Sequence, residues 1–81
     1  MERTEILEKL TLVFRDTLDN EALQLTEQST ASEVDDWDSL NHVQLVVAIE
    51  HDFHIRFNSV EIQTWKNVGE MIDSIQAKIP A

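Results

Sequence analysis

The chain of 81 residues contains 6 Lys and Arg residues against 16 Asp and Glu residues, which gives a formal net charge of −10. This length allows one domain, residues 1–81, whose thin core leaves little room for a deep enclosed active site. The acidity argues against nucleic acid and anionic membranes as partners, because like charges repel, and the lack of Cys excludes disulfides, thiolate metal sites and a thiol nucleophile.

The hydropathy of the chain predicts a folded, soluble protein. No apolar run reaches the length of a membrane-spanning helix, and residues 1–5 lack the apolar core of a signal peptide. Because 42% of the residues are apolar, the chain is too hydrophobic for a disordered acidic tail. We therefore expect a monomer in the cytoplasm.

Helical periodicity accounts for the first and the central parts of the chain. With 1 Gly and 1 Pro, the sequence has too little turn chemistry for a many-stranded β fold. Apolar residues recur at steps of three and four over residues 3–18, which predicts an amphipathic helix. A second helix is predicted over residues 39–53, with Asp38 as its N-cap and Ser39 in its first turn.

Two Asn-x-x-Glu sequences resemble capping boxes in the last third of the chain. The pair Asn58 and Glu61 is predicted to open a short helix, and the pair Asn67 and Glu70 to open a final helix that stops near Pro80. The fold class is therefore all-α: a small four-helix bundle of three main helices and one short helix.

Residues 19–38 form a long acidic connection between the first two helices. This segment contains seven acidic residues and no Lys or Arg, so its net charge is −7. Connections of this length are usually functional or disordered. Its apolar residues suggest that it packs across the bundle, while a solvated loop that serves solubility is the plain alternative. These apolar residues are Leu23, Leu25, Val34 and Trp37.

Ser39 follows this loop at a predicted helix N-terminus, and three chemistries could use it there. A hydrolase nucleophile is disfavoured: His42 lies one turn away, but the sequence lacks a Gly-x-Ser-x-Gly elbow. A calcium loop starting at Asp36 fails, because Asn41 and Val47 occupy its sixth and twelfth positions. A serine bearing a phosphate or phosphodiester fits better, since free N–H groups and the helix dipole stabilise an anion. An Asp-Ser pair that only starts a helix remains the alternative.

The residues around Ser39 resemble the signature of acyl carrier proteins. The resemblance lies in Trp37-Asp38-Ser39-Leu40 and in Val43-x-Leu45-Val46-x-Ala48-Ile49-Glu50-x-x-Phe53, and the order of segments matches over nearly the whole chain. It implies that Ser39 carries 4′-phosphopantetheine, attached from coenzyme A by a phosphopantetheinyl transferase. The thiol of that group would hold an acyl group as a thioester, and the protein would be a carrier without catalysis of its own.

The second helix departs from the family at its docking surface. In the family, exposed carboxylates on this helix meet basic patches on acyl-loading, synthase and transferase enzymes, whereas Asn41, Gln44 and His51 occupy those places here. We infer that electrostatic steering has moved to the end of the acidic loop; drift on a surface face is the alternative. The predicted docking residues are Asp35, Asp36, Asp38, Leu40, Asn41, Gln44, Val47 and His51.

The resemblance also predicts a cavity for the acyl chain, lined by Val43, Val46, Ile62 and Trp65. The bulk of Trp65 would shrink this cavity and so hint at a short or polar cargo, unless Trp65 only fills the core. No metal site is expected, because His51 and His54 with Glu50 lack a fourth ligand.

The sequence thus predicts an acyl carrier of a specialised fatty-acid, polyketide or related pathway. Two alternatives stay open: an aminoacyl or peptidyl carrier with the same arm, and an acidic helical module that binds a basic partner and carries no arm.

Overall fold

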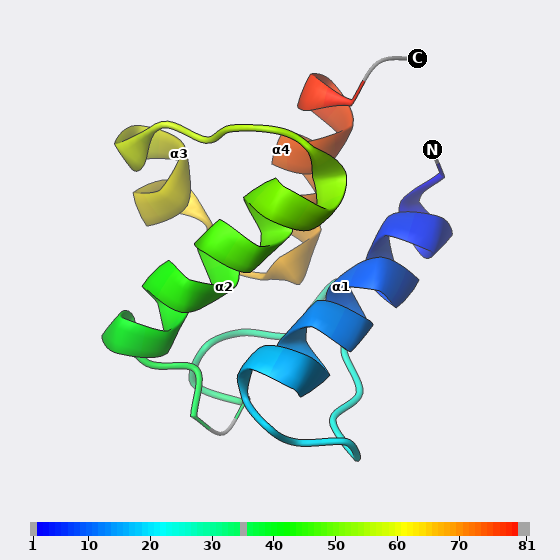
Figure 1. The fold of residues 1–81 in the computed structure, drawn as a ribbon, viewed down its shortest axis with the longest axis vertical. Helices are drawn as coiled ribbons and strands as arrows, with labels where there is room; N and C mark the ends of the chain where they lie inside the picture. The colour runs from blue at the N-terminus through cyan, green and yellow to red at the C-terminus, as the bar shows by residue number, and fades with distance from the viewer. Residues whose placement is uncertain (1, 35, 80–81) are drawn as a thin grey trace.

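Four helices make up the computed structural model, which describes residues 2–34 and 36–79. They are α1 (Arg3–Thr17), α2 (Ser39–Phe53), α3 (Ser59–Thr64) and α4 (Val68–Lys78), and no strand occurs in the described residues (Figure 1). The prediction of an all-α fold with one short helix is confirmed, and the predicted bounds differ from the observed ones by about one residue. Within the described residues, no helix is long and apolar enough to span a bilayer.

Asparagine side chains start the two C-terminal helices as the sequence predicts. At α3 the full capping box forms: the Asn58 side chain accepts the N–H of Glu61 at 2.8 Å, and the Glu61 carboxylate accepts the N–H of Asn58 at 3.2 Å. At α4 only half of the predicted box forms, since Asn67 accepts the N–H of Glu70 at 2.9 Å without the reciprocal contact. Trp65 ends α3 as its C-cap in an extended conformation.

The hydrophobic core lies where α1 packs against α2 and α4. Apolar residues spaced by three and four positions put one face of each helix into this core, where burial of apolar surface stabilises the fold. The largest fully buried side chains are Ile6, Leu10, Phe14, Leu45, Ile49, Val68, Met71, Ile72 and Ile75.

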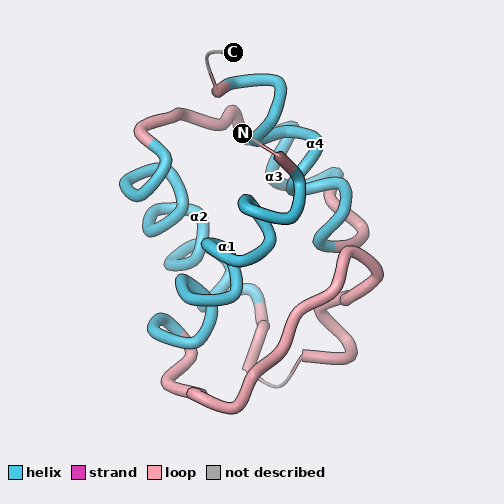
Figure 2. The backbone as a smooth tube through the Cα atoms, turned by 90° about the vertical axis from the view of Figure 1, so that its right-hand side faces the viewer, coloured by secondary structure: helices cyan, strands magenta, loops and turns pink. Residues whose placement is uncertain are grey.

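The long connection between α1 and α2 crosses the bundle instead of standing away from it (Figure 2). Leu25, Val34 and Trp37 are buried in the common core, as the sequence predicts. The N–H of Gly69 donates to the Glu27 carbonyl at 2.8 Å, so the loop supplies an acceptor to the first turn of α4. The absence of a side chain at Gly69 permits this approach, because a Cβ there would lie 3.0 Å from the Glu27 oxygen.

Arg3 ties the same part of the loop to two helices. Its guanidinium contacts the Glu27 carboxylate at 2.6 Å and the Asp73 carboxylate at 2.5 Å. The hydrogen bond from Arg3 lowers the pKa of Glu27 below its ordinary value. The loop is therefore held by backbone, apolar and ionic contacts, and its path fixes where α2 begins.

Candidate functional site

Asp38 and Asn41 build the turn that presents Ser39. The Asp38 carboxylate accepts the N–H of Asn41 at 2.9 Å and so caps α2. In return, the Asn41 side chain donates to the Asp36 carbonyl at 2.7 Å. Asp36 has a φ of 67°, in the left-handed region, which Asp tolerates better than most residues. The turn is therefore closed by its own polar groups.

Ser39 is the first residue of α2, and its side chain is exposed and free. Within the described residues, its hydroxyl has no hydrogen-bond partner, and the N–H groups of Ser39 and Leu40 have none either. Unpaired N–H groups at a helix start attract a phosphate. The position thus fits a serine that bears a phosphodiester.

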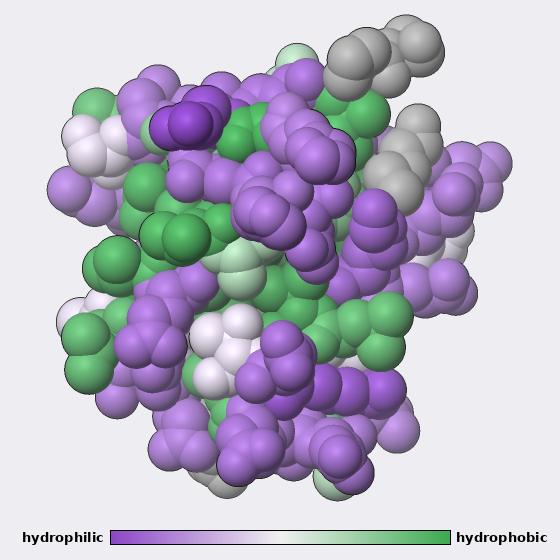
Figure 3. Space-filling view, viewed as in Figure 1, coloured by the Kyte–Doolittle hydropathy of each residue, from purple (hydrophilic) through white to green (hydrophobic). Residues whose placement is uncertain are grey.

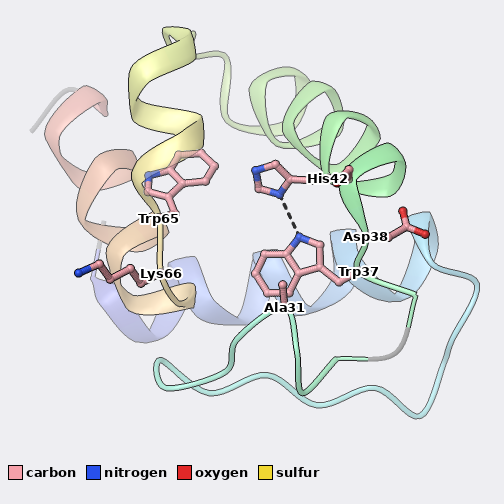
Figure 4. Close-up of a pocket in the computed structure, with 7 residues that line it drawn as sticks. Ala31, Trp37, Asp38, His42, Trp65 and Lys66 are labelled. Atoms are coloured by element: carbon pink, nitrogen blue, oxygen red, sulfur yellow. Dashed lines mark hydrogen bonds between the residues drawn. The ribbon is translucent and has the colours of Figure 1, made fainter.

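Ser39 lines an open groove of about 400 Å³. Figure 4 shows the indoles of Trp37 and Trp65 on either side of the His42 imidazole, with the hydrogen bond that joins Trp37 to His42. The aromatic side chains come from the loop, from α2 and from the connection after α3, so three segments meet beside Ser39. The lining residues are Ala31, Trp37, Asp38, Ser39, His42, Trp65 and Lys66.

Both ring nitrogens of His42 are engaged. The Trp37 Nε1–H donates to His42 Nδ1 at 2.9 Å, which makes Nδ1 an acceptor and places the imidazole proton on Nε2. That Nε2 lies 3.3 Å from the Ile62 carbonyl, to which it donates. His42 is therefore not arranged to take a proton from Ser39, and the hydrolase interpretation loses its base.

The groove floor belongs to a continuous row of five rings. Phe14 and Trp37 have centroids 5.0 Å apart, and Trp37 stacks on His42 at 6.0 Å. His42 meets Trp65 edge to face at 6.0 Å, and Trp65 meets Phe57 edge to face at 4.8 Å. This row connects the core under α1 with the surface between α2 and α3.

The predicted docking residues lie mostly on the surface. Leu40 and Val47 are 70% and 60% exposed, and Gln44, His51, Asp36 and Asp38 are also exposed. Asn41 is half-buried because its side chain serves the turn. Asp35 lies outside the described residues.

Of the four residues predicted to line an acyl cavity, Trp65 borders the groove. Val43 is 60% exposed, because two residues along a helix turn it to the side opposite the buried Leu45. Val46 is buried and Ile62 half-buried, and neither borders the groove. Sequence reasoning missed Ala31 and Lys66, which lie on connections where periodicity gives no signal of direction.

Comparison with known proteins identifies the family. Residues 8–75 match the family model described as the phosphopantetheine attachment site. An acyl carrier protein of Thermosynechococcus vestitus is 30% identical to the chain, over the full length of both. The chain belongs to the acyl carrier protein family. An acyl carrier protein of Saccharopolyspora erythraea is 32% identical over 73 residues, which cover 90% of this chain and 77% of that protein.

A solved structure agrees with both the fold and the family. The solution structure of a holo acyl carrier protein from Geobacter metallireducens matches with a TM-score of 0.83 and 39% identity, covering 89% of this chain and 83% of that one. The function of the chain is therefore that of an acyl carrier, and its cofactor is 4′-phosphopantetheine. The predicted family, fold class, cofactor and general function as an acyl carrier are confirmed.

Proposed function

We propose that Ser39 is the residue that carries 4′-phosphopantetheine and that the chain itself catalyses no step. The observation that supports this assignment is the free, exposed hydroxyl of Ser39 at the start of α2, beside two N–H groups without partners in the described residues. Asp38 and Asn41 close the turn with their own side chains, so the Ser39 hydroxyl is exposed and takes no part in holding the turn.

Loading exchanges one phosphoryl bond for another. The Ser39 Oγ gives its proton to a base of the transferase and bonds to the phosphorus that bears pantetheine in coenzyme A. The pyrophosphate bond at that phosphorus breaks, and adenosine bisphosphate leaves with the electron pair. The unpaired N–H groups of Ser39 and Leu40 would donate to the new phosphodiester.

We also propose that the loading and acyl-processing enzymes dock on the outer face of α2. Leu40, Val43 and Val47 follow one another at steps of three and four, so they share a face, and each is at least 60% exposed. Figure 3 shows apolar side chains along this side of the molecule, among polar ones. The carboxylates of Asp36 and Asp38 lie at one end of this apolar strip and would pair with a basic patch.

The pathway belongs to the same proposal. Gln44 and His51 leave the exposed face of α2 without the carboxylates expected for the family, which supports partners of a specialised fatty-acid, polyketide or related pathway. An aminoacyl or peptidyl cargo is the other outcome. Mass spectrometry of the native protein with its cargo intact distinguishes the two.

Intact mass after incubation with coenzyme A and a transferase of broad specificity tests the attachment site. We expect the chain to gain one phosphopantetheinyl group and Ser39→Ala to gain none. Ser59→Ala is the matched control, because Ser59 is also an exposed first residue of a helix. Modification of Ser39→Ala would show that another residue carries the group.

A further inference from the structure

The His42 ring fastens α2 to α3. It accepts a hydrogen bond from Trp37 at 2.9 Å on one side and donates to the Ile62 carbonyl of α3 at 3.3 Å on the other. An open channel between these two helices would require His42 to leave both partners. Polar groups that lose their partners in a half-buried position oppose such a movement.

Trp65 closes the space from the opposite side. Its indole packs edge to face on both His42 and Phe57, and its Nε1–H donates to the Ser74 hydroxyl of α4 at 2.8 Å. The Trp65 ring is therefore held by two ring contacts, with His42 and Phe57, and by one hydrogen bond, to Ser74. A side chain held in this way does not swing aside at low cost.

A salt bridge ties the first turn of α3 to α4. The Lys78 ammonium of α4 lies 2.9 Å from the Glu61 carboxylate, and both side chains are less than one-third exposed. Lys78 also lies 5.8 Å from the centre of the Phe57 ring. The short helix is thus tied to α2 through the Ile62 carbonyl and to α4 through the Glu61 side chain, so separation of α3 from either neighbour would break one of these contacts.

From these contacts we infer that the acyl cargo is not buried between α2 and α3 but stays in the open groove beside Ser39. The inference rests on the proposed attachment at Ser39. With about 400 Å³, the groove is near the lower end of the roughly 300–1,000 Å³ of small-molecule sites. Its ring faces suit a compact apolar group, and Asp38 and Lys66 make its edge polar, with their charged ends directed away from the rings (Figure 4). The cargo class is accordingly a short or polar acyl group.

A series of acyl lengths tests this inference. The chain is loaded from acetyl-, butyryl-, octanoyl- and dodecanoyl-coenzyme A, loading is verified by intact mass, and the unfolding midpoint is measured. A chain that enters the bundle would raise the midpoint by about 3–6 °C for each buried methylene. We expect the midpoint to stay level from butyryl to dodecanoyl. A steady rise with length would overturn the inference.

The position of the cargo gives a second readout. In the octanoyl form, nuclear Overhauser contacts from the terminal methyl group are measured against the aromatic and methyl protons of the protein. We expect any contacts to fall on Trp37 and Trp65, at the groove. Contacts with Val46 or Ile62 would place the cargo inside the bundle and refute the inference.

A variant that lacks the His42 ring is the comparison for the wild-type acyl series. His42→Ala removes the ring that ties α2 to α3 and opens a space between the two indoles, in which the Trp37 Nε1–H and the Ile62 carbonyl lose their partner. We expect the midpoint to rise with acyl length in His42→Ala and to stay level in His51→Ala, since His51 is an exposed histidine on the same helix. A level series in His42→Ala would contradict the role given to this ring; should that variant not fold, the wild-type series still decides.

The two proposals fail in different ways. If Ser39 accepts no phosphopantetheinyl group, the proposed attachment site is wrong, and this inference falls with it. If loading succeeds and the midpoint rises with acyl length in the wild-type chain, the attachment site stands and only the open-groove position of the cargo is wrong.

Discussion

The hydrogen bond between Trp37 and His42 allows a quantitative test of how the groove is built. In Trp37→Phe, the ring contact with Phe14 at 5.0 Å is largely retained, but the donor 2.9 Å from His42 Nδ1 is lost. An acceptor left without its partner costs about 1–2 kcal/mol, and the smaller ring of a residue that is 8% exposed adds about 1 kcal/mol. The expected loss of unfolding free energy is therefore about 2–3 kcal/mol.

Urea denaturation followed by far-ultraviolet circular dichroism measures this loss. In thermal denaturation, a domain of this size loses about 4–8 °C of its midpoint for each kcal/mol of unfolding free energy. The thermal unfolding midpoint should therefore fall by roughly 8–24 °C. A double-mutant cycle with His42→Ala isolates the pair, and we expect a coupling energy of about 0.5–1.5 kcal/mol. A coupling below about 0.3 kcal/mol, the usual limit of additivity for independent sites, would refute the role given to this hydrogen bond.

Three further predictions concern the loop. Gly69→Ala places a Cβ 3.0 Å from the Glu27 carbonyl oxygen. Although Ala has the better helix propensity, we expect this contact to lower the unfolding free energy by about 1–3 kcal/mol in urea denaturation. An unchanged unfolding free energy would contradict the close packing of the loop on α4. The pKa of Glu27 is lowered in the fold, so its ionised carboxylate stabilises the protein above pH 4.5, its ordinary pKa, and this stabilisation is lost as the pH falls below that value. The unfolding free energies of wild type and Glu27→Gln should therefore become equal in acid. A difference in unfolding free energy that does not change with pH would argue against the ion pair. Asp36→Asn with Asp38→Asn, which keeps an N-cap, should slow association with the transferase several-fold in low-salt stopped flow, whereas Gln44→Ala should not; equal effects would place steering elsewhere.

The helices follow from local signals, and the sequence predicts them well. Apolar residues at steps of three and four and capping residues such as Asp38 and Asn58 act within a single turn, so their effect is readable without knowing the rest of the fold. The same holds for the position of Ser39 at the start of α2. These features depend on neighbours in sequence.

The groove could not be predicted in the same way. Its lining joins Ala31 of the loop, His42 of α2 and Lys66 after α3, and these segments meet only through long-range packing. The sequence indicates that the Trp37 indole needs a partner, but not that His42 supplies it and passes a second hydrogen bond to Ile62. Val43 was also misjudged for a long-range reason. The helical wheel gives the angle between Val43 and the other residues of α2, but it does not say which side of the helix faces the core.

The structure separates two uses of the acidic loop. Glu27 pairs with Arg3 and Asp38 caps α2, so part of the charge serves the path of the loop and the start of the helix. Asp38 caps α2 with one carboxylate oxygen and is itself exposed, and the exposed Asp36 lies two residues before it. A partner with a basic patch would therefore meet charge on residues that also fix the turn at Ser39. Under the proposed docking, recognition and presentation of the hydroxyl depend on the same few residues, which is why charge removal must be tested with substitutions that preserve the cap.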